Sequence, residues 1–231
     1  MKNNDFKNFL RGCTQNFTPV IDKAFVKTDY FPIDLSVANQ SLKSIDFSSS
    51  DAVEHYINDY LQKNNSKVAY GGYIEQRAIY QRSSHFNQQD PETERNIHLG
   101  MDLWVQEKTD VLAVLDGEIH SFKDNTNFGD YGPTIILKHH FANTTFYTLY
   151  GHLSRESLTR IQVGQKFNQG EAIAQLGSAE VNGDYAPHLH FQIIKEIGTY
   201  LGDYPGVCSK KDLNYFSENC PDPNLVLKLI P

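Results

Sequence analysis

The stretch His188-Leu189-His190-Phe191-Gln192-Ile193-Ile194 decides the predicted fold. Successive side chains of an extended strand point to opposite faces, so the two histidines share one face. Leu189 and Phe191 then turn to the other face, where they can pack in an apolar core. We therefore predict a β-strand that carries two imidazoles on one side and hydrophobic packing on the other.

Short runs rich in Val, Ile, Tyr, Phe and Thr continue this pattern through the chain from Val68 onward, with Gly, Asn and Asp between them. Such runs between turn residues are typical of strands. The other candidate strands are residues 111–115, 117–122, 134–139, 145–150, 166–167 and 172–176. The pattern predicts a mainly β protein, with a sheet or barrel rather than alternating strands and helices.

The N-terminal part differs from this strand-rich region. Between Ser50 and Lys63, apolar and aromatic residues recur at helical spacing after a serine cap, namely Val53, Tyr56, Ile57, Tyr60 and Leu61. We predict an N-terminal extension over residues 1–67 that contains one amphipathic helix.

The C-terminal part is rich in glycine and proline after Lys195, which predicts a loop-rich tail with one short helix near Lys211 to Ser217. We predict a central domain over residues 68–195 and a C-terminal extension over 196–231 that packs on the core.

Composition limits the classes of function. The 231 residues are 39% hydrophobic and 12% aromatic, which suits a globular protein with a sizeable core. The net charge of -7, without a basic stripe, argues against a nucleic-acid partner. No segment has the roughly 18 apolar residues of a membrane span, and no signal peptide is visible, so we expect no membrane partner. The expected location is the cytoplasm, or the bacterial envelope if a leader has been removed; the oligomeric state is left open.

The three cysteines, Cys13, Cys208 and Cys220, form neither an even set nor a CxxC motif. We interpret them as reduced thiols, and leave a bridge between Cys208 and Cys220 open.

Four histidines and one aspartate lie in three short pieces. His98 and Asp102 are four residues apart, a spacing that lets the side chains converge, and Gly100 between them allows close approach of the backbone. His152 lies in Tyr150-Gly151-His152-Leu153, and the third piece is the strand that carries His188 and His190.

A catalytic zinc site uses about three His or carboxylate ligands and keeps a fourth position for water. His98, Asp102 and one of the two strand histidines satisfy that count. His152 and the remaining strand histidine are then free to transfer protons and to stabilise developing negative charge. The other histidines, His55, His85, His120, His139 and His140, are predicted not to be ligands, with one of His139 and His140 facing inward.

These residues, with the glycines between them, resemble the lysostaphin-like (LytM-type) zinc metallopeptidases, peptidase family M23. The resemblance covers about residues 72–194. Besides the HxxxD and HxH pieces, it includes Val-x-Ala-x-x-Asp-Gly at 111–117, Asp-Tyr-Gly at 130–132, Val-Gly-Gln at 163–165, Gln-Gly-Glu at 169–171 and Ala-Pro before His188.

The resemblance implies that His98, Asp102 and His190 bind Zn²⁺ and that His152 and His188 are the catalytic pair. It implies an antiparallel sheet with a barrel-sandwich core (a duplicated hybrid motif) and a groove across it. The implied substrate is a peptide, such as a bacterial cell-wall peptide containing glycine or D-amino acids.

The chain shows neither the export signal nor the wall-binding region usual in that family, which leaves the cell-wall substrate open. We consider three alternatives to cell-wall hydrolysis. One is a metal-stabilised binding or scaffold module without catalysis. Another is an M23-like hydrolase with a cytoplasmic substrate other than peptidoglycan. A phosphoryl-carrying module of sugar transport is disfavoured, because Asp102 and the HxxxD spacing indicate metal binding.

Overall fold

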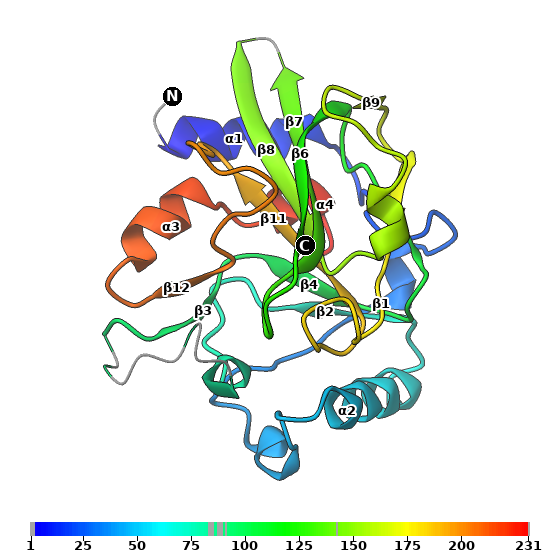
Figure 1. The fold of residues 1–231 in the computed structure, drawn as a ribbon, viewed down its shortest axis with the longest axis vertical. Helices are drawn as coiled ribbons and strands as arrows, with labels where there is room; N and C mark the ends of the chain where they lie inside the picture. Colours follow the sequence, from blue (N-terminus) through cyan, green and yellow to red (C-terminus); the bar gives the residue numbers. More distant parts are fainter. Residues whose placement is uncertain (1–2, 83–85, 87–89, 91, 142, 231) are drawn as a thin grey trace.

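The computed structural model describes residues 3–82, 86, 90, 92–141 and 143–230. Its largest element is an eight-stranded sheet (Figure 1). The strands lie in the order β1 (Tyr30–Pro32), β2 (Val68–Gly71), β4 (Met101–Trp104), β11 (His188–Ile194), β8 (Thr144–Gly151), β7 (Gly132–Phe141), β6 (Gly117–Asn125) and β9 (Lys166–Phe167). The predicted strand with two histidines is thus a central strand, and the mainly β fold is confirmed.

Two small antiparallel sheets accompany the large one. One pairs β5 (Asp110–Leu112) with β10 (Ala172–Gln175), and the other pairs β3 (Arg95–His98) with β12 (Val207–Ser209). The helices are α1 (Asn3–Cys13), α2 (Ser50–Lys63), α3 (Leu213–Asn219) and α4 (Asn224–Leu227), with 3-10 turns η1 (Lys27–Asp29), η2 (Gln40–Ser44), η3 (Ile79–Arg82) and η4 (Arg155–Leu158). Within the described residues, none of the helices has the length and apolarity needed to span a membrane.

One strand pair departs from the predicted antiparallel sheet. β1 pairs with β2 in parallel, so the sheet is mixed, although the other pairs described in it are antiparallel. Parallel neighbours need a long crossover connection, usually with a helix. The segment between β1 and β2 contains α2 and provides that crossover.

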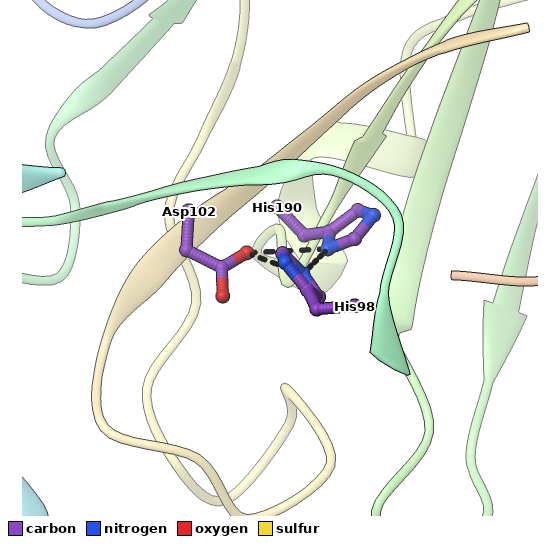
Figure 2. A group of neighbouring side chains, drawn as sticks. All are labelled: His98, Asp102 and His190. Atoms are coloured by element: carbon purple, nitrogen blue, oxygen red, sulfur yellow. Dashed lines mark hydrogen bonds and ion pairs between the residues drawn. The ribbon is translucent and has the colours of Figure 1, made fainter. Parts of the chain in front are cut away.

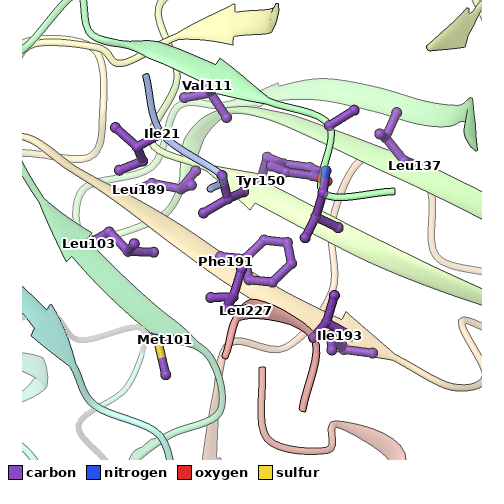
Figure 3. Close-up of a cluster of buried hydrophobic side chains, with 14 of the residues drawn as sticks. Ile21, Met101, Leu103, Val111, Leu137, Tyr150, Leu189, Phe191, Ile193 and Leu227 are labelled. Atoms are coloured by element: carbon purple, nitrogen blue, oxygen red, sulfur yellow. The ribbon is translucent and has the colours of Figure 1, made fainter. Parts of the chain in front are cut away.

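The apolar face of β11 lies in the main core, as predicted. Leu189 and Phe191 are fully buried and pack with Leu103 and Tyr150 from the neighbouring strands β4 and β8 (Figure 3). The histidines of β11 therefore occupy the opposite face of the same sheet.

The predicted amphipathic helix is α2. The Ser49 Oγ caps it by accepting a hydrogen bond from the backbone N–H of Ala52, and Val53, Ile57 and Leu61 are buried. These side chains pack in a cluster of their own with Ala69 and Trp104, at the β2 and β4 side of the sheet.

The prediction of a single helix in residues 1–67 is wrong, because α1 precedes α2. Phe6 and Leu10 bury one face of α1 in the main core, where Phe6 meets Phe146 of β8 edge-on with ring centroids 6.0 Å apart. Phe6, Phe9, Leu10 and Cys13 have helical spacing, but the helix is only 11 residues long, which leaves few repeats to detect.

The C-terminal tail has more regular structure than its glycines and prolines predict. α3 confirms the short helix, shifted by two residues, while β12 and α4 were not predicted. Val226 and Leu227 of α4 lie in the main core, and the Thr14 Oγ1 donates a hydrogen bond to the Val226 carbonyl over 2.6 Å. The division of the chain into three parts stays a prediction, and both extensions contribute to the central core.

Candidate active site

Strand pairing brings the site residues together. β11 lies between β4 and β8, and its antiparallel register sets His190 opposite Asp102 on one side and opposite Gly151 on the other. His152 directly follows β8, and His98 ends β3. The structure therefore gathers all five residues that the sequence predicts.

Three donor atoms converge at the predicted metal site (Figure 2). His98 Nε2 lies 2.8 Å from His190 Nδ1, and each of these nitrogens lies 3.2 Å from Asp102 Oδ1. In a tetrahedral zinc site with bonds of roughly 2.0–2.2 Å, ligand atoms are about 3.3–3.5 Å apart. The three buried side chains thus fit a divalent metal with little rearrangement.

Hydrogen bonds determine which nitrogen each metal-site histidine offers. His98 Nδ1 donates to the Gly72 carbonyl over 2.9 Å, and His190 Nε2 donates to Gln192 Oε1 over 2.8 Å. The lone pairs of His98 Nε2 and His190 Nδ1 are therefore available to a metal. Gly100 allows the predicted close approach, because a Cβ there would lie 2.7 Å from the His190 ring.

His152 and His188 form a second pair beside the donor set. Their ring centroids are 4.3 Å apart, and His188 Nε2 lies 3.8 Å from Asp102 Oδ1. His152 Nδ1 donates to the Asn182 carbonyl and His188 Nδ1 donates to the Ala186 carbonyl, each over 2.7 Å. Both rings consequently keep an unprotonated Nε2, which is the form a general base requires.

Burial and charge hold the site in the protonation states that metal binding needs. Burial lowers the pKa of His98 to about 4, lowers the pKa of His188, and lowers that of His152 well below 6.5. Burial alone would raise the pKa of Asp102, but His98 and Arg77 hold it well below its usual range. At neutral pH these three imidazoles are neutral and the carboxyl group is ionised.

Arg77 is part of the site, and the sequence analysis did not find it. Its buried side chain donates from Nη1 to Asp102 Oδ2 and from Nε to Glu75 Oε2. A single arginine between two strands has no motif spacing, so the sequence carries no signal for this contact.

A pocket of about 330 Å³ opens over these residues. Aromatic side chains form much of its wall, namely Tyr80, Trp104, Tyr131, Tyr185 and Tyr204. Leu35, Phe47 and Val53 from the N-terminal extension line it as well, and so do residues 203–207 of the C-terminal extension. Both extensions therefore shape the space available to a substrate.

The remaining histidines do not join the metal cluster formed by the described residues. His139 faces inward and His140 is exposed, as predicted. His85 lies outside the described residues.

The three cysteines are free thiols, so the bridge left open between Cys208 and Cys220 is not formed in this structure. Cys220 Sγ accepts a hydrogen bond from Gln192 Nε2 over 3.2 Å.

A donor set of two histidines and one carboxylate is typical of catalytic metal sites, and here two further imidazoles lie beside it. The sequence model described as "Peptidase family M23" matches residues 96–201, which include all five site residues. This segment of the chain is thus similar to peptidase family M23.

A relative found by comparison is similar to part of this chain. Endolysin 2638A of Staphylococcus phage 2638A is 34% identical over 97 residues, which are 42% of this chain and 18% of the endolysin. The chain therefore matches less than a fifth of that relative's length.

Two solved structures match about half of this chain. The catalytic domain of the antimicrobial peptidase lysostaphin from Staphylococcus simulans is 22% identical, covers 53% of this chain and 80% of its own, and has a TM-score of 0.36. The catalytic domain of the prophage-encoded M23 protein EnpA from Enterococcus faecalis is 20% identical, covers 56% and 92%, and has a TM-score of 0.36.

Proposed function

We propose that this chain is a zinc-dependent endopeptidase that cleaves cell-wall peptides containing glycine or D-amino acids. The observation that carries the proposal is the convergence of three donor atoms within 3.2 Å of one another, beside two histidines whose Nε2 atoms are unprotonated. The match to peptidase family M23 supports peptide hydrolysis, and the endolysin relative supports the substrate class. The location, in the cytoplasm or in the bacterial envelope if a leader has been removed, stays a prediction.

His98 Nε2, His190 Nδ1 and Asp102 Oδ1 would hold the zinc. When bound there, zinc supplies a Lewis acid that polarises the scissile carbonyl and lowers the pKa of water. Hydrolysis joins the water oxygen to the carbonyl carbon, breaks the C–N bond and delivers a proton to the leaving nitrogen. The Nε2 atoms of His152 and His188 can accept a proton, return it to that nitrogen, and donate to the developing oxyanion once protonated.

Two variants on one strand separate the proposed roles. His190→Ala should lose both zinc and activity, because it removes a metal ligand. His188→Ala lies two residues away on the same face, and should keep zinc while peptide cleavage falls by about 10²- to 10⁴-fold. Zinc is measured by elemental analysis, and cleavage with a pentaglycine peptide and with purified peptidoglycan.

The exposed His140→Ala variant is the control and should keep both properties. If wild-type protein prepared without chelator takes up no zinc when it is supplied, the proposal is wrong. Zinc uptake without cleavage of either substrate would instead favour a metal-stabilised binding module.

A further inference from the structure

Arg77 bridges two carboxylates beneath the predicted metal site. Its Nη1 contacts Asp102 Oδ2 and its Nε contacts Glu75 Oε2, and all three side chains are buried or nearly so. A planar guanidinium presents several donors in a fixed arrangement, so one arginine can hold two carboxylates at once. Asp102 therefore has a defined position before any metal binds.

Further contacts fix the arginine itself. Glu75 Oε1 accepts a hydrogen bond from the backbone N–H of Leu35 over 3.1 Å, which links this network to the N-terminal extension. The Arg77 guanidinium also lies over the Trp104 ring, 5.3 Å from its centroid. Trp104 is in β4, two residues after Asp102, so the arginine contacts the same strand twice.

The two oxygens of Asp102 are consequently divided between two partners. Oδ1 lies 3.2 Å from both ligand nitrogens, whereas Oδ2 contacts the guanidinium. A carboxylate can offer a metal one oxygen or both, and a catalytic zinc site needs a position that the protein leaves open.

We propose that Arg77 is a positioning residue that restricts Asp102 to a single metal contact and so keeps the fourth coordination position free. This inference rests on the proposed metallopeptidase function. Glu75 balances the charge of the arginine, because its carboxylate shares the guanidinium with Asp102. Without Arg77, Oδ2 is free to turn to the metal as a second oxygen ligand.

Cobalt(II) in place of zinc reports the number of ligands. A four-coordinate tetrahedral cobalt site lacks a centre of symmetry and absorbs visible light strongly, and absorption weakens as ligands are added. The Arg77→Met protein loaded with cobalt should absorb severalfold less than the wild type. Arg77→Lys should recover much of the absorption intensity, because the lysine ammonium can still donate a hydrogen bond to Asp102 Oδ2.

Arg95→Met is the matched control, because Arg95 also lines the pocket but donates its Nε to the Val207 carbonyl rather than to a metal ligand. It should keep the wild-type spectrum. A wild-type spectrum in Arg77→Met, or equal weakening in Arg95→Met, would overturn the inference.

The same samples separate this inference from the proposed function. Failure of the wild type to take up cobalt or zinc contradicts the function, whereas normal uptake with an unchanged Arg77→Met spectrum contradicts only the role of Arg77. Circular dichroism checks that each variant is folded. If Arg77→Met is not folded, Glu75→Gln replaces it. Glu75→Gln removes the ion pair that fixes Arg77 and should also reduce the absorption. An unchanged spectrum in this variant would overturn the inference.

Discussion

Each site histidine donates one ring N–H to a fixed oxygen. His98, His152 and His188 all use Nδ1 and a backbone carbonyl, which leaves Nε2 facing the site. His190 does the opposite, because the Gln192 side chain two residues along the same strand accepts from its Nε2. The hydrogen-bond acceptor therefore decides which ring nitrogen keeps its lone pair and faces the site.

His139 provides a test of pH dependence away from the metal. It is fully buried, with Nδ1 2.8 Å from the Asp116 carbonyl and Nε2 2.7 Å from Thr148 Oγ1, and burial lowers its pKa from 6.5 to about 4. Between pH 6.5 and pH 4, the His139 side chain binds a proton in the unfolded chain but stays neutral in the folded protein. The free energy of unfolding should therefore fall as the pH drops from 6.5 towards 4, by up to about 3 kcal/mol from this residue.

The measurement compares urea unfolding of the metal-free wild type and His139→Gln at pH 7.5 and pH 4.5. The two proteins differ only at residue 139, so the contributions of all other groups cancel in the comparison. The variant should lose about 2–3 kcal/mol less than the wild type over this interval. Equal losses in the two proteins would show that His139 does not carry the dependence.

Local spacing explains which site residues the sequence could predict. His98 with Asp102, and His188 with His190, are short-range patterns, and the family resemblance assigns roles within them. Arg77 reaches Asp102 across 25 residues of sequence, and no local pattern encodes that contact.

At the scale of elements, one loop orients both histidines of the proposed catalytic pair, His152 and His188. Asn182 and Ala186, between β10 and β11, supply the carbonyls that accept from His152 and His188. The loop is braced internally, since the Asn182 side chain accepts from the Tyr185 N–H over 2.9 Å and donates to the Tyr185 carbonyl over 3.0 Å. The distance between the two imidazoles thus depends on the shape of this loop.

Arg82 fixes the position of this loop, although it lies outside residues 96–201, which the family model matches. Its Nη2 donates to the Asp184 carbonyl, its Nη1 lies 3.4 Å from Asp184 Oδ2, and its guanidinium lies 4.5 Å from the centre of the Tyr185 ring. Arg82→Ala should lower kcat by roughly 10- to 100-fold through misplacement of the catalytic pair. Zinc content should stay unchanged, because none of the three proposed metal ligands lies within the loop.

Peptide cleavage and elemental analysis of one preparation test this expectation. Arg155→Ala is the control, because Arg155 is exposed and pairs at 3.0 Å with Asp124 on the surface. Full activity in Arg82→Ala, or loss of zinc in parallel with activity, would contradict the proposed action through the loop.

The predictability of an element depends on how it is buried. α2 has one buried face, which gives a helical repeat in the sequence. β4 carries Asp102 but is buried on both faces, so it shows no alternation and was not predicted as a strand. β1 joins the sheet through a parallel pairing with β2 across a long connection, and local sequence does not report such a contact.

At the scale of the whole molecule, the terminal extensions are continuous with the core. Ile21 forms a β-bridge with Val111, and the Thr18 N–H donates to the Leu227 carbonyl over 2.9 Å, which joins the two ends of the chain. Phe6 and Leu10 share the main cluster with Leu227. Both extensions also line the pocket over the candidate site. These contacts favour a single folding unit rather than three independent parts.

This organisation predicts one cooperative unfolding transition for the full chain. Trp104 is the only tryptophan, is buried beside His188 with ring centroids 5.6 Å apart, and reports on the site by fluorescence. Far-ultraviolet circular dichroism reports on the whole chain, so both probes should give the same urea midpoint.

A chain lacking residues 1–29 should be insoluble or unfolded, because it loses the side chains of α1 from the main core and exposes apolar surface. A soluble, folded fragment of residues 68–195 that still binds zinc would contradict the single unit and establish the central part as an independent domain.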